Sequence, residues 1–210
     1  MKGVALVLYC FGHFIFAIFY RLFYRRRIYG KENIPKKGPL IICANHISWH
    51  DPLAIGSALP VHYKIKFMAK EELFRNAFVA FILRMVGAFP VNRQAADSRA
   101  IRRAFQVLKE GGVVGIFPEG TRSKTGHLQR AQKGAALIAG RTGAPLLPVL
   151  IVGPYRLGRP LRIIFGPLFH LPPLEYSSRE EKKAYLEEGS RIIMEHLQAL
   201  LPADNNGGTD

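Results

Sequence analysis

The sequence predicts an α/β fold, with a largely parallel or mixed sheet flanked by helices and an N-terminal hydrophobic helix that associates with a membrane. Short apolar segments alternate with segments of helical periodicity, the pattern of strands joined by crossover helices. The segment 146–152 is almost continuously apolar, as in a strand covered on both faces. Residues 3–20 form a longer apolar run. A chain of 210 residues is long enough for one domain with a substantial core.

Apolar periodicity and turn residues predict each element in order. Asp51 before Pro52 predicts a helix start, with Asp51 as N-cap and Pro52 as the first helical residue. The glycines at 111, 112 and 143 predict helix ends. We expect strands at 40–44, 62–69, 87–91, 113–117, 146–152 and 161–165. We expect helices at 51–59, 71–85, 98–109, 130–141 and 178–200, and a turn-rich connector at 29–39.

The N-terminal segment has the composition of a membrane anchor. Residues 3–20 contain no Asp, Glu, Lys or Arg, and they are followed by Arg21, Arg25, Arg26 and Arg27. A run of about 18 residues is at the lower limit for crossing a bilayer, so a spanning and an interfacial helix are both open. A buried core helix is an alternative. A cleaved signal fits less well, because the basic residues mostly follow the apolar run.

These features divide the chain into three parts. We expect a membrane-associating helix at 1–28, a globular domain at 29–203 and a flexible tail at 204–210. The arginine cluster suits lipid headgroups, and the positive-inside rule predicts that the globular domain lies on the cytoplasmic side of the cell membrane.

The charge of the whole chain points to an anionic partner. There are 30 Lys and Arg residues against 15 Asp and Glu residues, a net charge of +15. Such a balance fits nucleic acid or an acidic membrane. Because no nucleic-acid-binding signature is present, we expect a membrane bilayer and no nucleic acid. Dinucleotide and P-loop fingerprints are also absent, so we expect no bound cofactor.

His46 and Asp51 are the first candidate for catalysis. They follow the expected strand 40–44, and a histidine can act as a general base near neutral pH. A carboxylate on its other nitrogen would fix the tautomer. On one continuous helix, five residues turn through about 500°, so the pair can meet only if His46 lies in the turn and Asp51 begins the helix. The alternative is that Asp51 only caps the helix, although both roles are compatible.

Two other chemistries are open to these residues but fit less well. His46, His50 and Asp51 could bind zinc, but no second ligand cluster is evident, so we expect no metal. Cys43 alternates to the face of its strand opposite His46, so we do not expect a cysteine nucleophile. The histidine would then activate an acceptor hydroxyl directly.

A second group of polar residues follows the expected strand 113–117. Glu119 and Arg122 stand in a turn shaped by Pro118 and Gly120, and arginine suits bidentate phosphate binding. Because two expected strands each end in polar side chains, we expect both strand ends to contribute to one site at one edge of the sheet. Taken alone, the turn could equally be a charged surface loop. Arg93 and Lys70 follow two other expected strands, and each could equally be a solvated basic side chain.

Four ordered motifs resemble those of the glycerolipid acyltransferase family, and within it the bacterial enzymes that acylate 1-acylglycerol 3-phosphate. The first is Asn-His-x-x-x-x-Asp at 45–51, and the third is Phe-Pro-Glu-Gly-Thr-Arg-Ser at 117–123. These two are highly specific. The second, at 87–93, carries Pro90 in place of the usual aliphatic residue, and the fourth surrounds the prolines at 145 and 148.

The resemblance implies a mechanism. His46 would take the proton of a glycerol hydroxyl while Asp51 orients it, and the hydroxyl would attack an acyl thioester of coenzyme A or acyl carrier protein as co-substrate. Backbone amides or Lys70 would stabilise the oxyanion. The residues implied to bind substrate are Arg93, Glu119, Gly120, Thr121, Arg122 and Lys70.

The expected product is phosphatidic acid made from 1-acyl-sn-glycerol-3-phosphate in phospholipid biosynthesis. One alternative is the same chemistry on another lysophospholipid or on a lyso-ornithine lipid. The other is a non-catalytic protein that binds anionic membranes.

Overall fold

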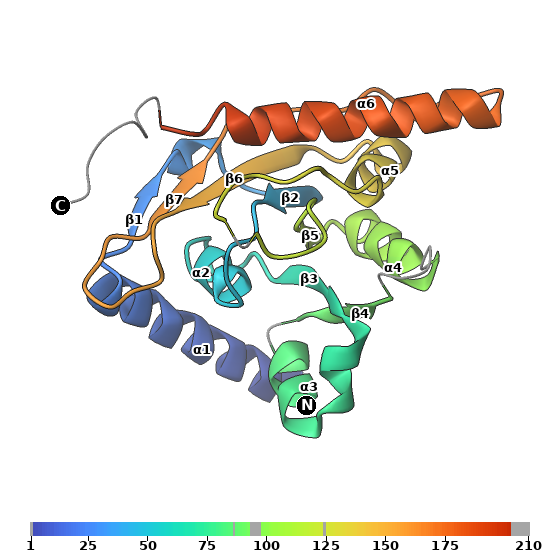
Figure 1. Cartoon of the computed structure of the whole chain (residues 1–210). Helices are drawn as coiled ribbons and strands as arrows, with labels where there is room; N and C mark the ends of the chain where they lie inside the picture. Colours follow the sequence, from blue (N-terminus) through green and yellow to red (C-terminus); the bar gives the residue numbers. More distant parts are fainter. Residues whose placement is uncertain (1, 86, 93–97, 124, 203–210) are drawn as a thin grey trace.

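The computed structural model describes residues 2–85, 87–92, 98–123 and 125–202, which form a mixed sheet flanked by helices (Figure 1). The strands are β1 (Arg27–Tyr29), β2 (Leu40–Ala44), β3 (Ile65–Lys70), β4 (Phe89–Val91), β5 (Val113–Ile116), β6 (Leu146–Val152) and β7 (Arg162–Phe165). The α-helices are α1 (Lys2–Phe23), α2 (Asp51–Gly56), α3 (Ala77–Met85), α4 (Ser98–Lys109), α5 (Gly134–Thr142) and α6 (Arg179–Gln198). Two 3-10 helices are η1 (Lys31–Asn33) and η2 (Glu71–Arg75). The predicted α/β class is confirmed.

The sheet has seven strands in the order β1-β7-β6-β2-β5-β3-β4. Strand β2 lies at its centre and runs parallel to both β5 and β6. Strand β7 pairs antiparallel with β6, and β1 pairs parallel with β7, which makes the sheet mixed. Because β2, β5 and β6 are parallel neighbours, their carboxyl ends meet at one edge, where α/β sheets bind ligands.

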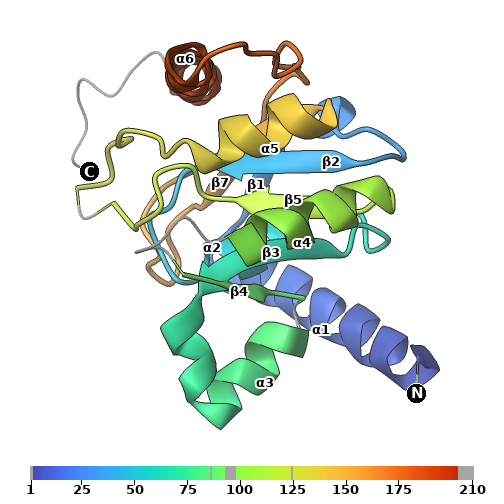
Figure 2. The same ribbon diagram turned by 90° about the vertical axis from the view of Figure 1, so that its right-hand side faces the viewer.

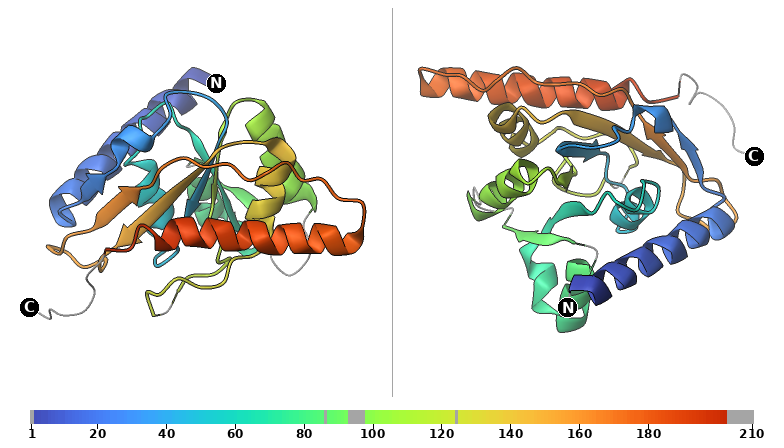
Figure 3. Two further views of the ribbon diagram at one scale, coloured as in Figure 1. Left: turned by 90° about the horizontal axis from the view of Figure 1, so that it is seen from above. Right: turned by 180° about the vertical axis from the view of Figure 1, so that it is seen from behind.

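Two helical layers cover the sheet. Helices α1 and α2 lie on one face, and α4, α5 and α6 lie on the other (Figures 2 and 3). Side chains of β2 alternate between the two cores, with Ile42 on the α1 face and Ile41 and Cys43 on the α5 face. All five residues of β2 are buried, which explains its continuous apolar sequence.

Helix α1 packs against the domain along one side. Tyr20 is fully buried, and the guanidinium of Arg26, just after the helix, donates to Ser57 Oγ at 2.7 Å. The other side of α1 exposes large apolar residues: Val7, Phe11, Phe14, Ile15, Ile18, Leu22 and Phe23. Among the helices that the structure describes, none combines the length and the apolar character needed to cross a bilayer.

Several boundaries differ from the sequence predictions. Strand β1 was not predicted, and the expected division of the chain at residue 28 falls inside it. The helix expected at 71–85 is broken at Asn76, whose extended backbone separates η2 from α3. The helix expected at 130–141 begins only at Gly134. The expected tail at 204–210 lies outside the described residues.

Candidate active site

His46 and Asp51 meet at the carboxyl end of β2. His46 Nδ1 lies 2.7 Å from Asp51 Oδ2, with His46 in the loop after the strand and Asp51 at the start of α2. This is the geometry on which the predicted pair depended. Because Nδ1 donates to the carboxylate, the neutral ring presents an unprotonated Nε2, which has no hydrogen-bond partner among the described residues. The His46 side chain retains 12% of its accessible surface, so the ring is not sealed in the interior.

The Asp51 carboxylate does not cap α2. It is fully buried, and its Oδ2 also accepts hydrogen bonds from the backbone amides of Ile47 at 2.7 Å and Ser48 at 2.8 Å. The helix start has no side-chain cap. The expectation that Asp51 acts as N-cap is therefore wrong, because the loop amides before the helix occupy the carboxylate.

The second oxygen of Asp51 has a partner that the sequence did not indicate. Tyr155, in the loop between β6 and β7, donates its hydroxyl to Asp51 Oδ1 at 2.7 Å. Burial, and then the charge of Asp51, raise the pKa of Tyr155, so this phenol remains a donor. The two residues are 104 positions apart, and no pattern in the sequence links them.

Two phenylalanines support the imidazole. The ring of His46 stacks on Phe117 at 4.0 Å between centroids, and Phe117 stacks on Phe67 at 5.6 Å. Gly115 makes room for this stack, because a Cβ at that position would lie 2.3 Å from Cε1 of Phe67. The aromatic residues therefore fix the plane of the His46 ring, and Asp51 fixes which edge of this ring faces the carboxylate.

The loop after β5 holds the backbone of His46 on both sides. Glu119 Oε1 accepts from the His46 amide at 3.1 Å, and the Ser123 amide donates to the His46 carbonyl at 2.7 Å. Glu119 is buried, and desolvation raises the pKa of its carboxyl, opposed by the hydrogen bond from the His46 amide. Its Oε2 has no hydrogen-bond partner among the described residues.

Asn45 joins β2 to β6 beyond the last strand pair. Its Nδ2 donates to the Ile151 carbonyl at 3.0 Å, and its Oδ1 accepts from the Ile151 amide at 2.7 Å. The buried side chain thus acts like a further peptide group of the sheet. This anchors the strand end from which His46 projects.

The other predicted site residues lie in different settings. Gly120 has φ of +72°, which suits glycine in the turn after Phe117. Thr121 and Arg122 follow it on the exposed part of this turn. Lys70 ends β3, and its Nζ lies 3.2 Å from Oε1 of Glu72. Arg93 falls outside the described residues.

A cavity of about 860 Å³ opens beside this turn. Glu119, Gly120 and Thr121 are among its lining residues, and Arg102 and Lys133 add positive charge. Its apolar lining includes Met68, Ile101, Phe105, Ile116, Ile138 and Leu186. The volume is in the range of small-molecule sites.

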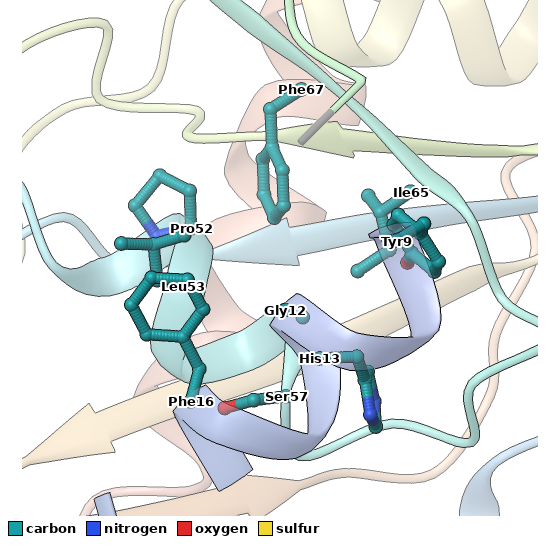
Figure 4. Close-up of a pocket in the computed structure, with 10 residues that line it drawn as sticks. Tyr9, Gly12, His13, Phe16, Pro52, Leu53, Ser57, Ile65 and Phe67 are labelled. Atoms are coloured by element: carbon teal, nitrogen blue, oxygen red, sulfur yellow. The ribbon is translucent and has the colours of Figure 1, made fainter. Parts of the chain in front are cut away.

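A smaller apolar pocket, of about 70 Å³, lies between α1, α2 and β3. Figure 4 shows Gly12 and Phe16 of α1 on one side of it and Phe67 of β3 on the other. Phe67 is the ring that stacks on Phe117 and so belongs to the support of His46.

The metal and thiol alternatives gain no support from the geometry. Among the residues described, no group of three or more His, Cys, Asp and Glu side chains is arranged to hold a metal ion. His50 Nδ1 faces the Tyr20 hydroxyl at 3.0 Å. Cys43 is fully buried, and this burial raises the pKa of its thiol to about 12.

The geometry is that of a base and its orienting acid at the edge of an α/β sheet. A family model described as Acyltransferase matches residues 25–152, which contain the loops after both β2 and β5. The chain belongs to the acyltransferase family, as the motifs predicted, and it is an enzyme that transfers acyl groups.

Individual proteins similar to this chain have names that specify an activity within this family. The chain is 33% identical over 181 residues to the 1-acyl-sn-glycerol-3-phosphate acyltransferase of Bacillus subtilis, covering 83% of this chain and 89% of that protein. It is 40% identical over 124 residues to the protein of the same name from Borreliella burgdorferi, covering 58% of this chain and 49% of that one. The crystal structure of the 1-acyl-sn-glycerophosphate acyltransferase PlsC from Thermotoga maritima superposes with a TM-score of 0.63 at 30% identity, covering 95% of this chain and 81% of that chain.

Substitution of Asp51 tests the buried hydrogen-bond network. We expect Asp51→Asn to lower the free energy of unfolding by about 1–3 kcal/mol, because an amide nitrogen would face donors where a carboxylate oxygen accepted. Urea unfolding followed by circular dichroism measures the change. The matched control is Glu32→Gln, the same exchange at an exposed carboxylate, which we expect to change stability by less than about 0.5 kcal/mol. Equal stability of the two variants would contradict the network.

Proposed function

We propose that this acyltransferase moves a fatty acyl group from a thioester of coenzyme A or acyl carrier protein to the free hydroxyl of 1-acyl-sn-glycerol-3-phosphate, giving phosphatidic acid. The observation that carries the proposal is the contact of His46 Nδ1 with the buried Asp51 carboxylate at 2.7 Å, beside the loop after β5. The names of the similar proteins support the acceptor.

In the proposed reaction, Nε2 of His46 takes the proton of the glycerol hydroxyl. The hydroxyl oxygen forms a bond to the thioester carbonyl carbon, and the carbon–sulfur bond then breaks. The proton on His46 passes to the leaving thiolate. Asp51 stabilises the imidazolium formed in between, and its burial keeps the carboxylate from turning away.

The acceptor would bind along the loop after β5. Arg122 is exposed on this loop, where a guanidinium can pair with the phosphate in a bidentate manner. The buried Glu119 would act indirectly, because its Oε1 accepts from the His46 amide and so fixes the loop after β5 beside the base. The cavity beside Gly120 and Thr121 has a largely apolar lining that suits a fatty chain.

We propose that the exposed face of α1 lies in the bilayer and that the catalytic domain is on the cytoplasmic side of the cell membrane. Phe11 and Phe14 are each 63% exposed, and an exposed apolar face of this kind marks an interaction site. Arg21 in the last turn of α1, and Arg25 and Arg27 just after the helix, are exposed and can meet anionic headgroups.

Replacement of the base is the main test of catalysis. We expect His46→Ala to lower kcat by at least about a hundredfold, the low end for loss of a general base. Labelled acyl thioesters of both carriers and a panel of lysolipids, including lysophosphatidate and a lyso-ornithine lipid, identify the donor and acceptor. The control His62→Ala removes an exposed histidine that precedes the amino end of β3, at the sheet edge opposite His46. This variant should leave kcat unchanged. A normal rate in His46→Ala would exclude this histidine from the mechanism.

Replacement of Arg122 tests phosphate binding. We expect Arg122→Ala to raise KM for lysophosphatidate at least about tenfold, because it removes a charge-assisted contact. KM for the acyl thioester should stay within about twofold. Arg130→Ala, at another exposed arginine, serves as the control. If KM for the acceptor is the same in both variants, Arg122 is only a surface residue.

Substitution on α1 tests the membrane contact. We expect the double variant Phe11→Ser with Phe14→Ser to lose at least about half of its binding to anionic vesicles in a flotation assay, because two apolar anchors are removed. The control pair is Leu168→Ser with Leu201→Ser, which removes exposed apolar residues elsewhere. Equal binding of the two double variants would refute the proposed contact.

A further inference from the structure

The buried carboxylate of Asp51 is held from two directions. The loop before α2 occupies Oδ2, through His46 Nδ1 and the amides of Ile47 and Ser48. Oδ1 accepts from the hydroxyl of Tyr155, which belongs to a different loop. Rotation of the carboxylate would break all of these bonds together. The orientation of the Asp51 carboxylate, and therefore that of the His46 ring, depends partly on the position of Tyr155.

The ring of Tyr155 is itself fixed by neighbours. The imidazole of His50 stacks on it at 5.1 Å between centroids with an interplanar angle of 16°. Tyr24 meets it edge-on at 5.8 Å and 71°. His50 immediately precedes Asp51, so the stack connects Tyr155 to the start of α2 by a second route.

His50 is in turn attached to α1. The hydroxyl of Tyr20 lies 3.0 Å from His50 Nδ1 and 3.3 Å from its carbonyl oxygen. Burial lowers the pKa of His50, opposed by the charge of Asp51, which favours a neutral ring against these tyrosines. Tyr20 is fully buried, so its hydroxyl has a fixed position.

The loop that carries Tyr155 is fastened to the same end of α1. The amide of Gly158 donates to the carbonyl of Phe23 at 2.7 Å, and the amide of Leu161 donates to the carbonyl of Tyr24 at 2.9 Å. In Figure 1 the loop between β6 and β7 reaches the C-terminal end of α1 at the left of the view. Helix α1, this loop and the start of α2 thus form one connected unit around Asp51.

We propose that Tyr155 and Tyr20 are positioning residues for the acyl transfer. Tyr155 holds Asp51 directly, and Tyr20 holds it through His50, so that the orientation of His46 depends on the seating of α1 against the domain. The inference rests on the proposed function of the His46 and Asp51 pair. It adds that the helix proposed to lie in the bilayer also supports the catalytic carboxylate.

Tyrosine-to-phenylalanine variants test this arrangement, because they remove a hydroxyl and keep the ring. The full chain would be assayed on vesicles containing lysophosphatidate, with kcat expressed per folded protein from circular dichroism. We expect Tyr155→Phe to lower kcat at least about fivefold, with KM for both substrates within about twofold, since in this proposal the tyrosine acts on Asp51 and not on substrate. Tyr20→Phe should lower kcat about two- to fivefold.

The double variant tests whether the two hydroxyls act through one unit. We expect the loss in Tyr20→Phe with Tyr155→Phe to be smaller than the product of the single losses, because residues of one network are not additive. The matched control is Tyr24→Phe. Its ring also contacts Tyr155, but no hydrogen bond joins its hydroxyl to Asp51 or His50 in the described structure. Its kcat should stay within about twofold of the wild type.

Amide hydrogen exchange gives a readout that does not need activity. We expect exchange in the segment 45–51 to be at least about threefold faster in Tyr155→Phe and unchanged in Tyr24→Phe. A wild-type kcat in Tyr155→Phe, a loss seen only in KM, multiplicative single losses, or unchanged exchange would each overturn the inference. Failure of the proposed function would give a different result, because the wild type would then make no product or His46→Ala would be fully active. In that case the hydrogen-exchange measurement would still decide whether Tyr155 orders the segment 45–51.

Discussion

The structure depends on a charge that is buried and fully supported. Asp51 has no exposed surface, and a carboxylate in such a place is tolerated only when hydrogen bonds replace the water it has lost. The loop amides, the imidazole and the phenol of Tyr155 supply those bonds. The same bonds restrict rotation of the carboxylate, so stability of the fold and orientation of His46 have one physical origin.

Sheet topology explains how so few residues can assemble this site. Three neighbouring parallel strands, β2, β5 and β6, end at one edge, and each contributes a loop. The first carries His46, the second Glu119 and the third Tyr155. Their backbones are joined there by the hydrogen bonds of Glu119 and Ser123 to His46 and by the bonds of Asn45 to Ile151. The loop that carries His46 is therefore anchored both at the strand end, through Asn45, and in the turn, through Glu119 and Ser123.

Much of the fold followed from local sequence. Helix α4 and strands β2 and β6 have the predicted bounds, because the helix has a strong apolar periodicity, the two strands are continuously apolar, and glycines or prolines border all three. Strand β1 escaped prediction, since three residues, Arg27–Tyr29, carry no pattern of their own and become a strand only by pairing with β7. The break at Asn76 was missed for a similar reason. The mixture of apolar and charged residues from 71 to 85 fits one helix, and only the packing of the folded chain decides where that helix is interrupted.

The sequence by itself determined the chemistry: a histidine and an aspartate five residues apart after a buried strand, a glycine-containing turn with Glu119 and Arg122, and an N-terminal apolar segment followed by arginines. Only the tertiary structure decided what surrounds that chemistry. It turned Asp51 from an expected helix cap into a buried acceptor, and it brought Tyr155 to Asp51 and Tyr20 to the adjacent His50 from distant parts of the chain. The reason is that a residue's type and near neighbours are written in sequence, whereas hydrogen bonds between distant loops arise only when the sheet brings their strand ends together.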